Sequence, residues 1–288
     1  MPENALAVDI GGTKLAAALV SPDGAVLQAV STATPSDGVF DALARLVVPL
    51  VGEAAVVGVG CGGPMTAGGE AVTPLNIPAW RGFPLRSELA ALTGLPVFVD
   101  NDAKALALGE GWVGAARGVP NYLGMVVSTG VGGGIVLDGR LLDGAAGNAG
   151  HIGHVIVEPD GRLCGCGARG CLEAEASGTA IAAVTGRPAR GAGPDVVERT
   201  GRLVGRAVAS VCNLLDLSLA VVAGSVALGF GEPFFAAAQA ELERSCRLSF
   251  SQGARIVAAE RGHEAPLVGA AAVAYRAGGQ RVLVATER

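Results

Sequence analysis

The chain has 288 residues, half of them hydrophobic, and a formal net charge of −5 at pH 7. No apolar run approaches about 18 residues, and the start, MPENALAVDIGG, lacks the basic and apolar regions of a secretory signal. We therefore expect no membrane association and a cytoplasmic protein. The sequence has no basic cluster of the kind that neutralises nucleic-acid phosphates, so we expect no nucleic-acid partner.

Short strands joined by glycine turns dominate the first hundred residues. The elements expected there are strands over 5–10, 14–20 and 25–34, a helix from Phe40 to Val51, and strands over 55–62 and 95–100, with a Pro-rich loop over 73–84. The last two strands are continuous apolar runs, which is typical of strands buried on both faces of a sheet.

The order of elements then begins again. Strands over 122–128 and 134–137 flank the turn TGVGGG, and RLLDG follows an Asp-Gly turn. Further on we expect a helix over 196–217, a strand within 218–227 that stops at the Gly-Ser turn at 224–225, a strand over 255–260 and a helix over 266–277. Strands that alternate with helices in this repeated order predict an α/β protein of two lobes.

The first glycine turn is Asp9-Ile-Gly-Gly-Thr-Lys14, between two strands. Gly11 and Gly12 would let backbone N–H groups approach a phosphate, and Thr13 and Lys14 add donors and a positive charge. Asp9, at the end of its strand, could hold Mg²⁺ through water. Taken alone, the motif could equally be an ordinary hairpin turn.

A second and a third glycine segment strengthen the phosphate interpretation. Thr129, Gly130, Gly132 and Gly133 form the second turn, and Gly224 with Ser225 would let an adenosine approach the end of a strand. Two glycine hairpins with threonines are what two lobes would need to grip a polyphosphate from both sides. The order and spacing of the three segments together predict an ATP site.

Residues 150–171 gather two of the three histidines and three of the six cysteines. In a reducing cytoplasm such a cluster favours a metal site over disulfides. One imidazole and three thiolates suit a closed, structural zinc site. The segment offers five ligands, and the HxxH spacing alone leaves His151 open as an alternative to His154. The other cysteines, Cys61, Cys212 and Cys246, lie in apolar surroundings and are expected in the core.

Five motifs, DIGGTK, VDNDA, STGVGGG, HIGH…CGCGARGC and VVAGSVA, resemble in this order those of the ROK family of bacterial sugar kinases. The resemblance implies the two-lobed actin-like ATPase fold, with ATP and sugar in the cleft between the lobes, and a homodimer. The reaction implied is phosphoryl transfer from ATP to a sugar hydroxyl. We expect residues 1–100 with 277–288 to form the small lobe and 101–276 the large lobe.

The same resemblance implies roles for single residues. Asp102 would be the catalytic base, and Asp9 would hold Mg²⁺. The sugar contacts would be Asn76, Asn101, Asp102, His151, His154 and Glu173, and the zinc ligands His154, Cys164, Cys166 and Cys171. Strand alternation puts Asp100 on the same face as Asp102, and only the resemblance favours Asp102. Asn101 or Asp102 could also serve as a helix N-cap. Lys104, in the helix that follows, is expected in solvent.

The position of His151 carries a glutamate in most sugar kinases of the family. The sequence AGHIGH, with VSTGVGGG and DIGGTKLAAAL, resembles the N-acetylmannosamine kinases, which implies phosphorylation of that sugar on its 6-hydroxyl. Alternatives are a glucokinase or a broad hexose and hexosamine kinase, a ROK transcriptional repressor and a non-catalytic sugar sensor. A repressor would need a helix-turn-helix before the first strand, which here begins by residue 5, and the intact Asp9, Asp102 and glycine turns argue against a sensor.

Overall fold

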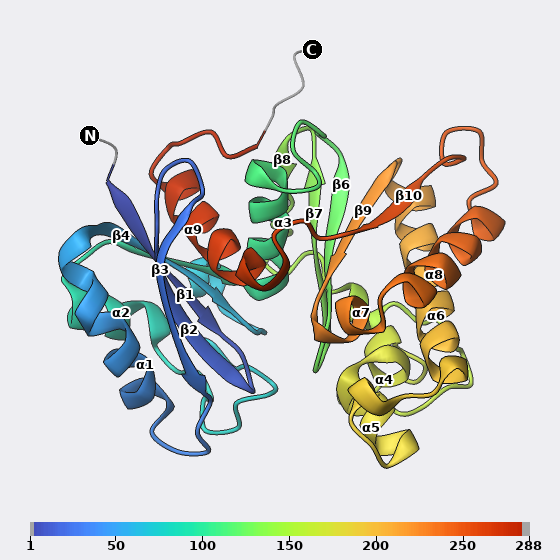
Figure 1. The fold of residues 1–288 in the computed structure, drawn as a ribbon, viewed down its shortest axis with the longest axis horizontal. Helices are drawn as coiled ribbons and strands as arrows, with labels where there is room; N and C mark the ends of the chain where they lie inside the picture. The colour runs from blue at the N-terminus through green and yellow to red at the C-terminus, as the bar shows by residue number, and fades with distance from the viewer. Residues whose placement is uncertain (1–2, 284–288) are drawn as a thin grey trace.

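The structure, a computed structural model, describes residues 3–283 and contains two five-stranded sheets (Figure 1). The first sheet holds β1 (Asn4–Ile10), β2 (Lys14–Val20), β3 (Val26–Ala33), β4 (Ala54–Cys61) and β5 (Val97–Asn101). The second sheet holds β6 (Tyr122–Val127), β7 (Val131–Leu137), β8 (Arg140–Leu141), β9 (Leu219–Ala223) and β10 (Arg255–Ala258). The predicted α/β class is confirmed.

The two sheets have one topology. The strand orders are β3-β2-β1-β4-β5 and β8-β7-β6-β9-β10. In each sheet the first three strands in chain order form an antiparallel meander, and the last two run parallel to the first strand on its other side. The repeated architecture predicted from the sequence is therefore confirmed.

Helices cover both faces of each sheet (Figure 1). The outer helices are α1 (Val39–Val47) and α2 (Leu85–Thr93) on the first sheet and α6 (Pro194–Leu215) and α8 (Glu232–Ser245) on the second. Between the sheets lie α3 (Asp102–Val113) and α9 (Ala265–Ala277). Alternation along β1 explains this layering, because Leu6 and Val8 face the outer helices while the smaller Ala5 and Ala7 face the central pair.

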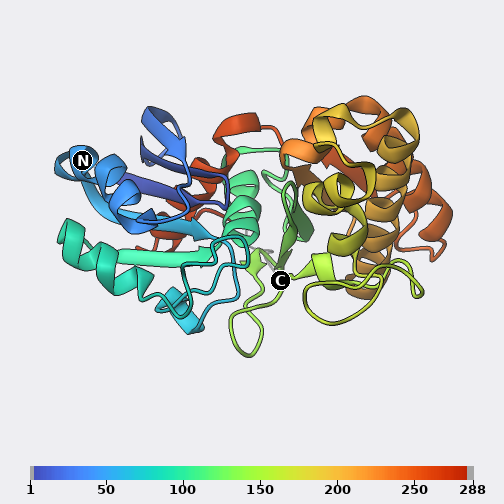
Figure 2. The ribbon, with the colours of Figure 1, turned by 90° about the horizontal axis from the view of Figure 1, so that it is seen from below.

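The central helices touch backbone to backbone. A Cβ added to Gly109 of α3 would lie 2.9 Å from the Cα of Gly269 in α9. Helix α9 packs even more closely on the first sheet, because a Cβ on Gly58 would lie 2.0 Å from the carbonyl oxygen of Ala270. The chain thus returns to the first sheet before residue 276. Seen from below, α3 stands between the two sheet layers (Figure 2).

Several elements differ from the sequence-based expectations. The predicted helix from Phe40 divides into α1 and a 3-10 helix over Val48–Glu53, where Pro49 lacks the N–H that an α-helical turn requires. The predicted stop of the strand at the Gly-Ser turn is confirmed, because β9 ends at Ala223, but the turn opens a helix, α7 (Ser225–Phe230), that the sequence did not indicate. The sequence reading did not anticipate α2, α4 (Leu172–Ala176), α5 (Gly178–Thr185), α7 and α8. Across residues 3–283, no helix has the length and apolarity needed to cross a membrane.

Candidate active site and metal centre

The first glycine turn lies at the end of β1, beside the loop that carries Asn76. Its backbone closes through a hydrogen bond of 3.0 Å from the N–H of Gly11 to the carbonyl of Lys14. A Cβ on Gly12 would lie only 2.5 Å from the Cβ of Asn76, so a larger residue would push this loop away. The side chains of Thr13 and Lys14 are exposed beside the turn.

Asn101 and Asp102 occupy the junction between β5 and α3. Asn101 is the N-cap of α3, since its side-chain oxygen accepts a hydrogen bond of 3.0 Å from the N–H of Ala103. The carboxylate of Asp102 accepts from the same N–H at 2.8 Å. The predicted capping role of Asn101 is confirmed, and capping fixes both side chains at the carboxyl end of the strand.

Asp9 and Asp102 are two buried carboxylates whose pKa values are both raised. Burial raises the pKa of Asp9 to about 7; the nearby Asp102 acts in the same direction, and Lys14 opposes it. Burial also raises the pKa of Asp102, which the N–H of Ala103 and the neighbouring His151 partly offset. A raised pKa makes each carboxylate a stronger base and a group that gains from a cation beside it.

Glu173 joins the second glycine turn to helix α4. One of its carboxylate oxygens accepts a hydrogen bond of 3.0 Å from the N–H of Val131. A Cβ on Gly130 would lie 2.8 Å from that oxygen and 3.8 Å from the side-chain nitrogen of Asn76. The second turn therefore lies between Glu173, on the side of the second sheet, and Asn76, on the side of the first sheet.

His151 lies opposite Asn101 across Gly63, in the loop that follows β4. A Cβ on Gly63 would lie 3.4 Å from the side-chain nitrogen of Asn101 and 3.7 Å from Cε1 of His151. His151 is exposed overall, yet desolvation of its ring lowers the pKa and His154 adds to this effect, while Asp102 opposes it. The lowered pKa favours the uncharged imidazole, which has one donor and one acceptor nitrogen.

The second and third glycine segments meet at one end of the second sheet. The hydroxyls of Ser128 and Ser225 lie 2.9 Å apart. The carbonyl of Thr129 accepts from the N–H of Thr179 at 3.2 Å and from its hydroxyl at 2.9 Å. The N–H of Gly178 donates to Ser128 at 2.7 Å. Sequence reasoning missed Gly178 and Thr179, although a serine N-cap followed by Gly-Thr was a usable signal for a helix start at this place.

The glycines of the second and third segments do not all lie in turns. Gly132 and Gly133 are inside β7, and a Cβ on Gly133 would lie 3.0 Å from the carbonyl oxygen of Gly150. Packing therefore suffices to require glycine at this position. Gly224 has φ 102° and lies against the carbonyl of Val127, where a Cβ would be 2.3 Å from the oxygen. Only glycine fits there, and it turns the chain from β9 into α7.

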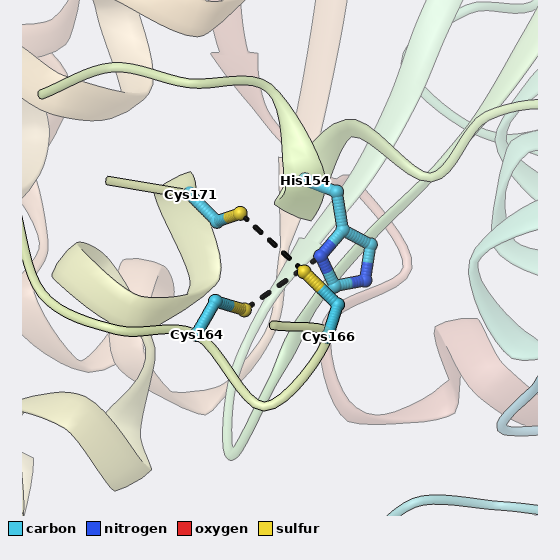
Figure 3. A group of neighbouring side chains, drawn as sticks. All are labelled: His154, Cys164, Cys166 and Cys171. Atoms are coloured by element: carbon cyan, nitrogen blue, oxygen red, sulfur yellow. Dashed lines mark hydrogen bonds between the residues drawn. The ribbon is translucent and has the colours of Figure 1, made fainter. Parts of the chain in front are cut away.

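Four side chains converge on one point beside this site (Figure 3). They are His154, Cys164, Cys166 and Cys171, whose ligand atoms all lie within 4.8 Å of one another. Nδ1 of His154 is 3.8 Å from Sγ of Cys164, and the sulfurs of Cys166 and Cys171 are 3.7 Å apart. Tetrahedral zinc with Zn–S bonds of about 2.3 Å separates its ligand atoms by about 3.8 Å. The donor set and its spacing therefore fit zinc.

Local backbone structure builds this cluster. Cys164 and Cys166 lie at the tip of a small hairpin, in which the N–H of Cys164 donates to Ala168 at 2.7 Å. Cys171 precedes α4, which carries Glu173, and His154 ends a 3-10 helix over Ile152–His154, directly after His151. A metal held here would tie together the two segments that carry His151 and Glu173.

The prediction that Lys104 is solvated is wrong. Its side chain is only 3% exposed, and its ammonium lies 3.2 Å from Asp100, 2.8 Å from Asp143 and 3.1 Å from the carbonyl oxygen of Gly147. The helical pattern could not predict this burial, because the loop that covers Lys104 contains Asp143, which lies 39 residues further along the chain. Asp100 therefore faces Lys104, while Asp102 faces His151 and Glu173.

The sequence profile described as "ROK family" matches residues 5–277. The chain belongs to the ROK family. An N-acetylmannosamine kinase of Escherichia fergusonii is 37% identical over 289 aligned positions, which cover 93% of this chain and 97% of that protein. Among solved structures, a ROK hexokinase from Thermus thermophilus is 36% identical, with a TM-score of 0.83 and coverage of 96% of this chain and 99% of the other.

A second solved ROK structure has ligands. It is a glucokinase from Streptomyces griseus in complex with glucose and AMPPNP, 32% identical, with a TM-score of 0.82 and coverage of 95% of this chain and 99% of that one. Together these matches establish the ROK family and the actin-like two-lobed fold expected from the motifs.

Proposed function

We propose that the protein is an ATP-dependent sugar kinase that transfers the γ-phosphate to the 6-hydroxyl of N-acetylmannosamine. The observation that carries the proposal is that the first and second glycine turns both lie beside Asn76, and that Asp102 is close enough to Asp9, His151 and Glu173 to interact with them electrostatically. Kinship with N-acetylmannosamine kinases over 93% of the chain supports the choice of sugar.

In this proposal Asp102 accepts the proton of the attacking hydroxyl. Its carboxylate is desolvated and held by the N–H of Ala103, and Asp100 is a poorer candidate because Lys104 and Asp143 surround it. The glycine turns would position the phosphates through their N–H groups, and Asp9 would hold Mg²⁺ through water. When bound, Mg²⁺ neutralises charge that develops on the phosphoryl oxygens.

The sugar would lie between Asn76, Asn101, His151 and Glu173. The ring of His154 lies 6.0 Å from that of His151, centroid to centroid, and its Nδ1 lies 3.8 Å from Sγ of Cys164. We assign His154 chiefly to the metal. Neutral His151 can donate one hydrogen bond and accept one, which suits a single hydroxyl or amide rather than a vicinal pair of hydroxyls.

We further propose that zinc binds to His154, Cys164, Cys166 and Cys171 and acts as a structural ion. All four positions of a tetrahedron would be filled by protein, leaving none for a substrate or water. Its effect on activity would be indirect, through the segments that carry His151 and Glu173.

The second candidate function is a glucokinase or a broad hexose kinase, which the T. thermophilus hexokinase and the S. griseus glucokinase favour at 36% and 32% identity. A panel of N-acetylmannosamine, N-acetylglucosamine, glucose and mannose, assayed for ADP release with the purified protein, decides between the two.

We propose a cytoplasmic location and, from membership of the ROK family, a homodimer. All six cysteines are free thiols in the structure, which suits a reducing compartment. Light scattering coupled to size-exclusion chromatography measures the oligomeric state: a mass near twice 28.4 kDa supports the dimer and a mass of 28.4 kDa contradicts it.

A further inference from the structure

Lys104 is a buried cation that the proposed chemistry does not use. An ammonium group has three N–H donors and no acceptor. Here three oxygens lie around it, from Asp100 at 3.2 Å, Asp143 at 2.8 Å and Gly147 at 3.1 Å. No donor is left over for a substrate, so Lys104 can act on the reaction only through the groups that it holds.

Two of these three oxygens belong to the 142–150 loop, which ends directly before His151. The loop closes on itself through a bond of 3.0 Å from the N–H of Ala149 to the carbonyl of Asp143. At its far end Gly150 presses on β7, where a Cβ would lie 2.3 Å from the carbonyl oxygen of Gly133. Lys104 therefore fixes one side of the loop, and β7 fixes the other.

The 142–150 loop also reaches the first lobe. The side-chain nitrogen of Asn148 donates to the carbonyl of Met65 at 3.4 Å, in the loop that contains Gly63. The third partner of Lys104, Asp100, lies on β5, one residue before Asn101. One side chain thus links the strand that carries Asn101 to the loop that presents His151.

We propose that Lys104 is a positioning residue for the sugar, which holds the 142–150 loop so that His151 faces Asn101. The inference rests on the proposed sugar site and deepens it. The loop's other polar contacts with the rest of residues 3–283 are weaker restraints on it. They are backbone hydrogen bonds, the bond of 3.4 Å from Asn148 to Met65, and the Arg276–Asp143 ion pair, which is long at 3.7 Å. Loss of Lys104 therefore releases the loop without touching a group that contacts the phosphates.

The test compares K104M, which removes the charge at similar length, with D143N, which weakens the contact from the exposed end. Asp143 is 56% exposed, so D143N is expected to fold even where K104M does not. R244M is the matched control, since it removes an ion pair with Glu241 on α8, on the outer face of the second sheet. Calorimetry gives the Kd of the sugar and of AMPPNP separately, and steady-state assays give kcat and both KM values.

We expect K104M to lower kcat/KM for the sugar by about 10- to 100-fold, as displacement of a positioning group by about 1 Å can do. D143N should give part of that loss, and the double variant no more than K104M alone, because both act through one contact. The Kd of AMPPNP and the zinc content should be unchanged in both, and R244M should resemble the wild type.

A role in stability alone would lower the melting temperature and leave the sugar Kd of the folded protein unchanged, which overturns the proposal. Equal losses for sugar and AMPPNP overturn it as well. If K104M does not fold, D143N decides, and an unchanged sugar Kd in D143N refutes the positioning role. Should the wild type prefer glucose, the proposed substrate fails but the same comparison, made with glucose, still tests Lys104.

Discussion

Replacing Asp102 by asparagine separates chemistry from binding. The change conserves shape, and the asparagine oxygen can still accept from the N–H of Ala103, so the start of α3 should persist. Removal of a general base typically costs 10²–10⁴-fold in rate, or about 2.7–5.5 kcal/mol of activation free energy. We expect the upper half of that range, because Asp100, the nearest rival on the same strand end, is paired with Lys104.

The same variant, although it loses activity, should be at least as stable as the wild type. Burial raises the pKa of Asp102 above its ordinary value of 3.8, so the folded protein binds this proton more tightly than the unfolded chain does. The ionised carboxylate therefore costs stability once the pH exceeds 3.8, and asparagine removes that cost. At pH 8 D102N should melt at the wild-type temperature or above, and the difference should vanish below pH 3.8.

The assay measures kcat by coupled ADP release and sugar Kd by calorimetry, for D102N and for the matched control D100N. We expect D100N to change kcat by less than about tenfold while D102N loses about 10³-fold or more. The sugar Kd of D102N should stay close to the wild-type value. A D102N variant that keeps more than about a tenth of the wild-type kcat, or a D100N variant that loses more than D102N, would move the role away from Asp102.

Three further predictions address the metals and the sugar. Elemental analysis should find one zinc per chain, and C166S should lose the metal and melt at a lower temperature, because structural zinc contributes to folding; a zinc-free wild type contradicts this. Because the pKa of Asp9 is raised to about 7, protons should compete with Mg²⁺ for this carboxylate below that pH. The Mg²⁺ concentration that gives the half-maximal rate should therefore rise by up to about tenfold for each unit by which the pH falls. Equal Mg²⁺ requirements at pH 6 and pH 8 would count against the role of Asp9. H151E should improve glucose phosphorylation and narrow the preference for N-acetylmannosamine without changing ATP affinity, since a carboxylate can bridge two hydroxyls; an unchanged preference removes His151 from specificity.

Much of the fold could be predicted from local signals. Glycine turns between apolar strands located both hairpins, and the repeated order of elements anticipated two sheets of one topology. An N-cap at Asn101 or Asp102 followed from their place between a strand and a helical pattern, and the structure has it at Asn101. Signals of this kind act over a few residues, so a single sequence contains them.

Features set by distant segments could not be predicted in this way. The burial of Lys104 depends on Asp143, which lies 39 residues away, and nothing near Lys104 in the sequence indicates that loop. Gly133 shows the same limit. In the sequence it looks like part of a phosphate-binding glycine motif, but in the structure its close contact with Gly150 is enough to require glycine. Strand alternation put Asp100 and Asp102 on one face, and it could not show that Asp100 pairs with Lys104.

The relative activity of the protein on different sugars tests the central claim most directly. Purified wild-type protein, with ATP and Mg²⁺, should be assayed on N-acetylmannosamine, N-acetylglucosamine, glucose and mannose, with the product identified by phosphorus NMR. We expect the 6-phosphate of N-acetylmannosamine, and a kcat/KM for that sugar about tenfold or more above glucose, or about 1.4 kcal/mol of differential transition-state binding. Glucose as the best substrate would contradict the assignment of N-acetylmannosamine, and no turnover on any of the four sugars would contradict the kinase itself.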